Sequence, residues 1–402
     1  MSATIPAVVG ELPGWPEFDD EQREAVDRVL RSGRVNYWTG EETRLFEREY
    51  AAALDVPHAV AVSNGTVALE CALAALEVGP GDEVVVPSRT FLATASSVAM
   101  RGARPVFADV DANSGNMTAG TVEAVLTPRT KAVIAVHLAG WPCEMDELCH
   151  LARSRGLAMI EDCAQAHGAT YRGRPVGTWG DIGCFSFCQD KILTTGGEGG
   201  LVVTSDPQLW QRMWSFKDHG KSWDAVYNRT HSGLFKWLHE SLGTNGRMAE
   251  MQAAIGRIQL RRLGEWSSRR RRNAAAFDVA LAGVPGLHIV TPPAHVEHAY
   301  YKYYAFVEER ELTPGWTRDR LALTLQQAGV PCGSGSCSEI YREGALAPFA
   351  PETARTTARR LGETSLMLLV HPTLTEAHIR AMGDAVRAAF FLAADERPRL
   401  AA

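Results

Sequence analysis

Between about residues 58 and 205, short apolar runs alternate with stretches whose apolar residues recur at helical spacing. Strands are predicted at residues 58–63, 82–87, 105–110, 131–138 and 157–161. Helices are predicted between them, at residues 66–76, 93–100, 121–126 and 145–155. Continuous apolar strands are buried on both faces, and alternation with helices favours parallel pairing. The sequence therefore predicts an α/β fold with a mostly parallel sheet covered by helices on both sides.

The pattern changes after residue 162. Two more strands are predicted on either side of a glycine-rich turn, at residues 184–187 and 201–204. The rest of the chain is predicted to form three parts. These are an N-terminal arm with one helix at residues 20–32, a long helix at residues 248–282 and a smaller α+β unit with elements at residues 303–307, 318–328 and 376–390. We therefore expect two domains. Residues 1–255 form the arm and a large domain, and residues 256–402 form a small C-terminal domain.

Composition narrows the class of protein. The chain has 402 residues, with 46% hydrophobic and 22% charged residues and a net charge of −6. This charge gives no reason to expect binding to nucleic acid or membranes. The eight cysteines show no CxxC spacing, so neither a metal site nor a disulfide framework is expected. No signal peptide and no membrane-spanning apolar run are recognised, and the expected location is cytoplasmic.

Lys191 and Asp162 are the two residues that most strongly indicate chemistry. Lys191 lies between an apolar strand and the glycine-rich turn at residues 196–200. A lysine so placed can form a Schiff base with an aldehyde. Asp162 ends a buried strand, where sites form in α/β folds, and its carboxylate can pair with a pyridinium nitrogen. Together they meet the needs of pyridoxal phosphate, although Asp162 could also be a simple capping residue.

Other residues fit the same cofactor. Gly65 and Thr66 stand between a strand and a helix, where helix N–H groups can bind a phosphate, and Ser186 can add a second contact. Gln165 can hydrogen-bond the ring oxygen. Phe91 can stack on a planar ring. Two of these assignments have an ordinary alternative, which is helix capping for the segment of Thr66 and core packing for Phe91.

These motifs together resemble the DegT/DnrJ/EryC1/StrS family of pyridoxal phosphate-dependent sugar aminotransferases. The matching segments are residues 64–69, 81–87, 90–91, 105–110, 161–168, 185–191, 196–200 and 243–248, followed by Glu250 and Gln252. The resemblance covers roughly residues 20 to 390. It implies the aspartate-aminotransferase-like fold (fold type I) and a homodimer with two shared sites.

The resemblance also implies a role for each candidate residue. Lys191 carries the Schiff base, Asp162 contacts the pyridine nitrogen and Gln165 the ring oxygen. Phe91 stacks on the ring. The phosphate is held by Gly65, Thr66 and Ser186 together with Asn245 of the other subunit.

The sugar pocket is where the chain departs from better-known members. Many of them carry His and Tyr near a Pro in the small domain, but the comparable region here is residues 333–341. Tyr341 and His371 are the candidate pocket residues in that domain. His219, after the large-domain strands, is a third.

The expected reaction is a ping-pong transamination that proceeds through pyridoxamine phosphate. Glutamate or glutamine donates the amino group, and a keto-sugar, foremost a nucleotide-linked keto-hexose, accepts it. A cyclitol ketone is an open alternative acceptor. Relatives that dehydrate a sugar use histidine in place of the lysine, so Lys191 argues against a dehydratase. A relative that forms an aromatic amino acid by dehydration and a catalytically silent, cofactor-binding subunit are further alternatives.

Overall fold

The computed structural model describes residues 5–8 and 11–395. A seven-stranded sheet forms its centre, in the order β1-β9-β8-β5-β4-β2-β3. Four strand pairs in it are parallel, and only β9 runs against its neighbours β1 and β8. The α/β fold and the mostly parallel sheet predicted from the sequence are confirmed. The strands of this sheet are β1 (His58–Val62), β2 (Glu83–Pro87), β3 (Arg104–Ala108), β4 (Thr130–Val136), β5 (Ala158–Asp162), β8 (Ile182–Ser186) and β9 (Gly200–Thr204).

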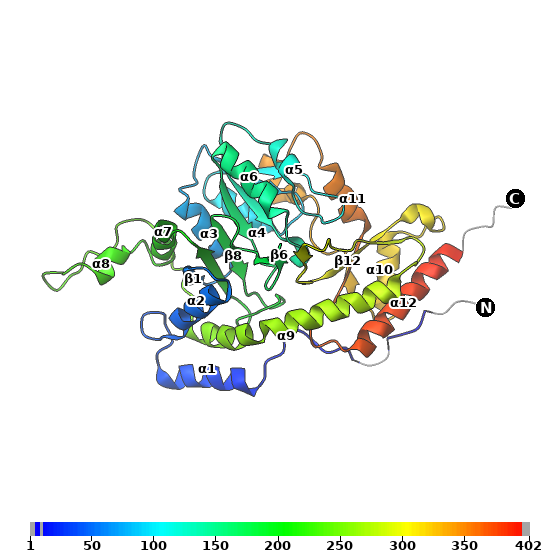
Figure 1. Ribbon diagram of the computed structural model, residues 1–402, viewed down its shortest axis with the longest axis horizontal. Coiled ribbons are helices and arrows are strands. Elements are labelled where there is room, and N and C mark those ends of the chain that lie inside the picture. Colours follow the sequence, from blue (N-terminus) through cyan, green and yellow to red (C-terminus); the bar gives the residue numbers. More distant parts are fainter. Residues whose placement is uncertain (1–4, 9–10, 396–402) are drawn as a thin grey trace.

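Helices cover both faces of this sheet (Figure 1). Consecutive residues of β2 show the reason, because Val84 and Val86 belong to one apolar cluster and Val85 to another. Side chains alternate between the two faces of a strand, so each face needs its own helical cover. The helices of this part are α1 (Asp20–Ser32), α2 (Glu42–Ala53), α3 (Gly65–Ala75), α4 (Leu92–Met100), α5 (Ala119–Glu123), α6 (Met145–Arg155), α7 (Pro207–Lys217) and α8 (Trp223–Tyr227).

The C-terminal part has a core and a sheet of its own. Its four strands pair antiparallel in the order β10-β12-β14-β13, and its apolar cluster is separate from those of the large sheet. Its elements are β10 (Leu287–Ile289), β12 (Tyr303–Val307), α10 (Arg318–Gln327), β13 (Cys332–Gly333), α11 (Thr356–Thr364), β14 (Ser365–Leu368) and α12 (Glu376–Asp395). A small third sheet joins β11 (Val296–Glu297), β6 (Thr170–Tyr171) and β7 (Arg174–Pro175). Short 3-10 helices lie at Leu138–Gly140, Glu309–Glu311, Ile340–Arg342 and Gly344–Phe349.

Helix α9 (Glu250–Leu281) connects the two parts. It packs against α1 and α2 and also against α12, so it runs beneath both cores (Figure 1). The proposed boundary after residue 255 falls inside this helix. The N-terminal arm lies on the C-terminal part, where the backbone N–H of Val8 donates to the carbonyl of Ala328 at 2.8 Å. None of the helices in the described residues is long and apolar enough to cross a membrane.

Candidate active site

A cavity of about 890 Å³ opens at the carboxyl ends of the central strands. Asp162 and Ser186, the last residues of β5 and β8, form part of its wall. The C-terminal part closes the opposite side with Tyr301, Lys302 and Tyr304 among others. Apart from Asn245, the residues predicted for the cofactor line this one cavity, namely Gly65, Thr66, Phe91, Asp162, Gln165, Ser186 and Lys191.

The N-terminus of α3 forms one end of the cavity. Asn64 caps the helix, with its Oδ1 accepting from the backbone N–H of Val67 at 2.9 Å. Thr66 is therefore not the cap, and its hydroxyl is left for the cavity. A β-carbon added to Gly65 would lie 2.6 Å from Cβ of Ser186. Glycine thus lets the helix start approach the end of β8, and the two segments make a cradle of N–H and hydroxyl donors suited to a phosphate.

Asp162 is buried, with a relative exposure of 7%. Its two oxygens accept hydrogen bonds from the Thr94 hydroxyl at 3.0 Å and from the backbone N–H of Ala164 at 3.1 Å. Burial raises the pKa of this carboxyl group, whereas both hydrogen bonds and the charge of Lys191 oppose the rise. A carboxylate that has lost its water gains stability from a cationic N–H partner placed in the cavity.

Gln165 and His167 follow β5 and have different surroundings. The Gln165 Oε1 atom accepts from the backbone N–H of Ala139 at 2.6 Å, so the amide NH2 is the end available to a ligand. His167 is fully buried and contacts the Tyr50 hydroxyl at 2.7 Å and the Ser186 carbonyl at 2.8 Å. The carbonyl only accepts, so Nε2 of His167 donates to it and Nδ1 accepts from Tyr50. His167 is therefore a packed residue that supports the end of β8.

Lys191 lies in the loop after β8. Its backbone carbonyl accepts a hydrogen bond from the indole N–H of Trp15 at 2.8 Å, which ties the lysine to the N-terminal arm. Its Nζ atom lies 4.8 Å from the ring centre of Tyr301, a residue of the C-terminal part. Segments that are far apart in sequence therefore hold the backbone of this lysine and lie beside its amine.

Phe91 stands at the N-cap position of α4 and projects into the cavity. Its relative exposure is 68%, which is unusual for a large aromatic side chain beside a buried sheet. An exposed ring on a cavity wall can cover the face of a planar ligand.

Four predicted residues are not brought to this cavity within one chain. His219 and Asn245 are both exposed and lie together, because residues 218 and 245 form an antiparallel bridge. Tyr341 is packed against Phe107, and its hydroxyl is engaged by Glu339 and by the backbone N–H of Arg355. His371 instead lines a separate cavity of about 230 Å³. The hydroxyl of Tyr341 is thus already committed to its own domain.

Sequence reasoning missed several residues of the wall. Lys302 lines both cavities, and its Nζ atom lies 3.7 Å from Oδ2 of Asp190. Tyr301 and Tyr304 stand beside it at the start of β12. The sequence predicts this strand but not its place in the wall. The tyrosines around a lysine were the available signal of a site, because so many polar groups are unusual in a core strand.

His137, Glu161 and Cys163 have side-chain types that bind metals, and they lie together at the end of β5. Their polar atoms already have partners. Nε2 of His137 contacts Glu161 at 3.0 Å, and its Nδ1 accepts from the backbone N–H of Cys143. Glu161 also accepts from three backbone N–H groups, at residues 177, 179 and 180. This cluster is a hydrogen-bond network that anchors the end of β5.

Known proteins resemble this chain over nearly its whole length. The solved structure of an aminotransferase from Psychrobacter cryohalolentis superposes with a TM-score of 0.93 at 51% identity, covering 95% of this chain and 100% of that one. The UDP-N-acetyl-3-dehydro-alpha-D-glucosamine 3-aminotransferase of Acidithiobacillus ferrooxidans is 37% identical over 92% of this chain and 93% of its own.

A third relative has a different kind of acceptor in its name. The L-glutamine:2-deoxy-scyllo-inosose aminotransferase of Streptomyces kanamyceticus is 40% identical over 75% of this chain and 72% of its own. The sequence profile of the DegT/DnrJ/EryC1/StrS aminotransferase family matches residues 16–387. The chain therefore belongs to this family of pyridoxal phosphate-dependent aminotransferases.

Proposed function

We propose that this enzyme transfers an amino group from glutamate or glutamine to a nucleotide-linked keto-hexose in amino-sugar biosynthesis. The observation that carries the proposal is the single cavity lined by Lys191, Asp162 and the N-terminus of α3. An amine base, a buried carboxylate and a phosphate cradle are the groups that pyridoxal phosphate chemistry requires. The sugar relative from Acidithiobacillus ferrooxidans supports the acceptor class.

The cavity walls fit the cofactor. Gly65 and Ser186 would hold its phosphate, since only a glycine leaves room for that approach. Asp162 would face the pyridine nitrogen, and the amide NH2 of Gln165 would donate to the ring oxygen. Phe91 would cover one face of the ring. When bound, pyridoxal phosphate supplies an electrophilic carbon for amines and a ring that accepts electrons from the substrate carbon.

In this proposal, Lys191 transfers the protons. Its Nζ atom takes the proton from the α-carbon of the amino donor and later returns a proton to the carbon that receives the nitrogen. Asp162 holds a proton at the pyridine nitrogen, because its buried carboxylate favours a cationic partner. Tyr301 and Phe91 exclude water from the two sides of the reacting centre.

We further propose a homodimer in which Asn245 reaches the phosphate in the partner's cavity. Asn245 is exposed and lines no part of its own cavity. The segment before it, which carries α8 and projects from the body in Figure 1, exposes apolar side chains. Those with the highest exposure are Leu234, Phe235, Trp237 and Leu242. Apolar groups so exposed favour burial against a second copy.

The test of acceptor class is a panel of ketones. The protein is first loaded with the amine form of the cofactor and is then mixed with nucleotide-linked 3- and 4-keto-hexoses and with cyclitol ketones. The proposal expects the visible absorbance of the aldehyde form to return with a nucleotide-linked sugar. A return with cyclitols alone would favour the second candidate function, which rests on the relative from Streptomyces kanamyceticus. A purified protein that binds no cofactor would contradict both.

A further inference from the structure

Arg89 is a buried cation without a counter-charge. It follows β2, and its relative exposure is 1%. Its Nε and Nη1 atoms have no hydrogen-bond partner, and no ion pair within the described residues includes it. Burial lowers the pKa of this guanidinium group, which the Tyr304 hydroxyl opposes, and another cation, Arg318, lies near it. A buried charge left unpaired destabilises the folded state, so the fold retains this arginine at the expense of stability.

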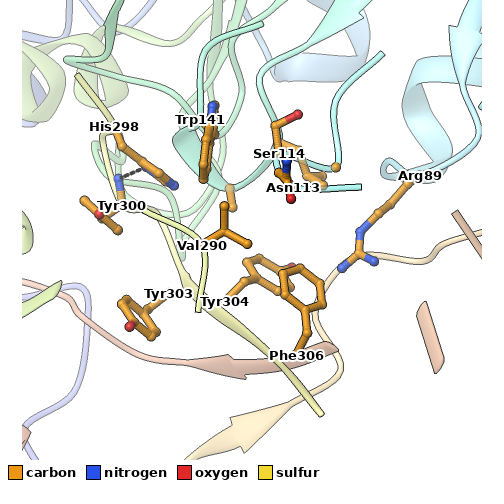
Figure 2. A pocket seen from close by; sticks show the side chains of 13 residues that line it. Arg89, Asn113, Ser114, Trp141, Val290, His298, Tyr300, Tyr303, Tyr304 and Phe306 are labelled. Carbon is orange, nitrogen blue, oxygen red and sulfur yellow. Dashed lines mark hydrogen bonds between the residues drawn. The ribbon is translucent and has the colours of Figure 1, made fainter. Parts of the chain in front are cut away.

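The guanidinium group points into a small cavity. Figure 2 shows Arg89 directed toward a pocket whose other walls include the aromatic residues Trp141, Tyr300 and Phe306. None of the 13 residues that line the pocket is Asp or Glu. Its volume is about 40 Å³, enough for a few water molecules or one small group such as a carboxylate. The pocket therefore offers a positive charge and no negative one.

This small pocket adjoins the large cavity. Tyr304 lines both, and Cζ of Arg89 lies 5.4 Å from its ring centre. Cys337, another wall residue of the large cavity, lies close enough to interact electrostatically with Arg89. Arg89 also shares the β2–α4 loop with Phe91. An anionic arm of a substrate whose reacting carbon lies near Lys191 thus has a cation within its reach at the edge of the same site.

We propose that Arg89 binds a substrate oxyanion, either a carboxylate of the amino donor or a phosphate of the nucleotide-linked sugar. A guanidinium group recognises both, because its planar donors match their oxygens. Its unpaired state is then an adaptation to the ligand, which supplies the missing charge. This assignment deepens the proposed function and rests on it for the identity of the two substrates.

The experiment uses the cofactor-loaded enzyme and two probes, glutarate as a dicarboxylate and uridine diphosphate. Thermal unfolding and calorimetric titration are measured for wild type, Arg89→Met and Arg89→Lys. Loss of one charged contact lowers affinity roughly ten- to a hundredfold. Arg89→Met is expected to lose that much affinity for one probe, and Arg89→Lys is expected to keep part of it. Loss for glutarate identifies the donor carboxylate, and loss for uridine diphosphate identifies the sugar phosphate.

A second readout separates binding from structural support. Without probe, Arg89→Met should unfold at the same or a higher temperature, because an uncompensated buried charge has been removed. Failure to fold, or strong destabilisation, would show that Arg89 is structural and would overturn the proposal. Unchanged affinity for both probes would overturn it as well.

Arg101→Met is the matched control. Its guanidinium group also lies over an aromatic ring, 5.5 Å from the centre of Phe216, and its Nε atom is also unpartnered. It lines neither cavity, so its probe affinities should equal those of wild type. The binding measurements need no turnover. If amino transfer is never found but glutarate binding still depends on Arg89, the proposed function fails and the anion site stands.

Discussion

At the scale of single residues, the proposed reaction depends most on Lys191. Its backbone is fixed by Trp15 and its amine lies beside Tyr301, so only the end of the side chain is free to act. Lys191→Ala should remove the visible absorbance of the bound cofactor and lower kcat by at least about a thousandfold. Absorbance spectra and single-turnover kinetics with glutamate measure both. A variant that keeps full turnover would contradict the assignment.

His167 gives a prediction for pH. Burial lowers its pKa to about 4 from an ordinary value of 6.5. The unfolded chain therefore binds a proton at His167 more readily than the folded chain does. The stability that neutral His167 gives to the folded state is complete above about pH 6.5 and is lost as the pH falls toward 4. Between about pH 7 and pH 5, the free energy of unfolding of wild type should fall by about 2 kcal/mol more than that of His167→Gln.

Chemical denaturation at the two pH values measures this difference. His150→Gln is the control, because His150 is exposed, and it should keep the pH dependence of wild type. An equal fall in His167→Gln and wild type would show that His167 is not the group responsible.

The residues predicted for the cofactor, apart from Asn245, line one cavity. They lie at helix starts, at strand ends or in the loops that follow strands, which local patterns reveal. Sequence reasoning did not find Arg89, because a cation there has meaning only once its burial is known. It placed Tyr341 in the pocket from its position near residues 333–341. In the structure the Tyr341 hydroxyl instead contacts Glu339 and the backbone N–H of Arg355. Its ring packs on Phe107, a contact between distant parts of the sequence that no local pattern reveals.

At the scale of elements, the phosphate cradle depends on the close approach of α3 to β8. Gly65→Ala would bring a β-carbon to 2.6 Å from Cβ of Ser186 and 3.3 Å from its Cα. Overpacking of this kind destabilises a fold by about 1–3 kcal/mol and here also pushes the helix start away from its ligand. Cofactor affinity should therefore fall, as measured by titration of the cofactor-free protein.

Gly264→Ala is the matched control. Gly264 lies inside α9, is exposed and has nothing within 4 Å of an added β-carbon. Alanine should stabilise this helix by about 0.5–1 kcal/mol and leave cofactor affinity unchanged. Equal cofactor affinity in the two variants would contradict the cradle.

Elements with strong periodicity were predicted well. The predicted bounds of α1, α6 and β12 match the structure residue for residue, since apolar spacing and end signals agree there. The sequence did not reveal α2 or α7, whose surfaces carry many polar residues and whose apolar positions acquire meaning only against the sheet. The arm also lies on the C-terminal part through contacts such as Val8 with Ala328, which no local pattern encodes.

At the scale of the whole molecule, the proposed homodimer with shared sites predicts complementation between inactive variants. Lys191→Ala and Asn245→Ala homodimers are each expected to be impaired. If Asn245 serves the partner's cavity, a mixed dimer has one site with both defects and one intact site. Random exchange of subunits makes about half of the dimers mixed, so about a quarter of wild-type activity should be restored. Mixing Lys191→Ala with Asp162→Ala is the control and should restore none, because both residues line the same cavity. No recovery in the first mixture would contradict the shared site.

In the proposed reaction, nitrogen moves from an amino acid to a sugar through the cavity around Lys191. The most direct measurement follows an isotopic label in the amino group of glutamate or glutamine, with a nucleotide-linked keto-hexose as acceptor and mass spectrometry of the products. A labelled amino sugar and an equal amount of keto acid are expected with wild type, and neither is expected with Lys191→Ala. A product that has lost water and carries no label, or the same labelled product from Lys191→Ala, would contradict the proposed reaction.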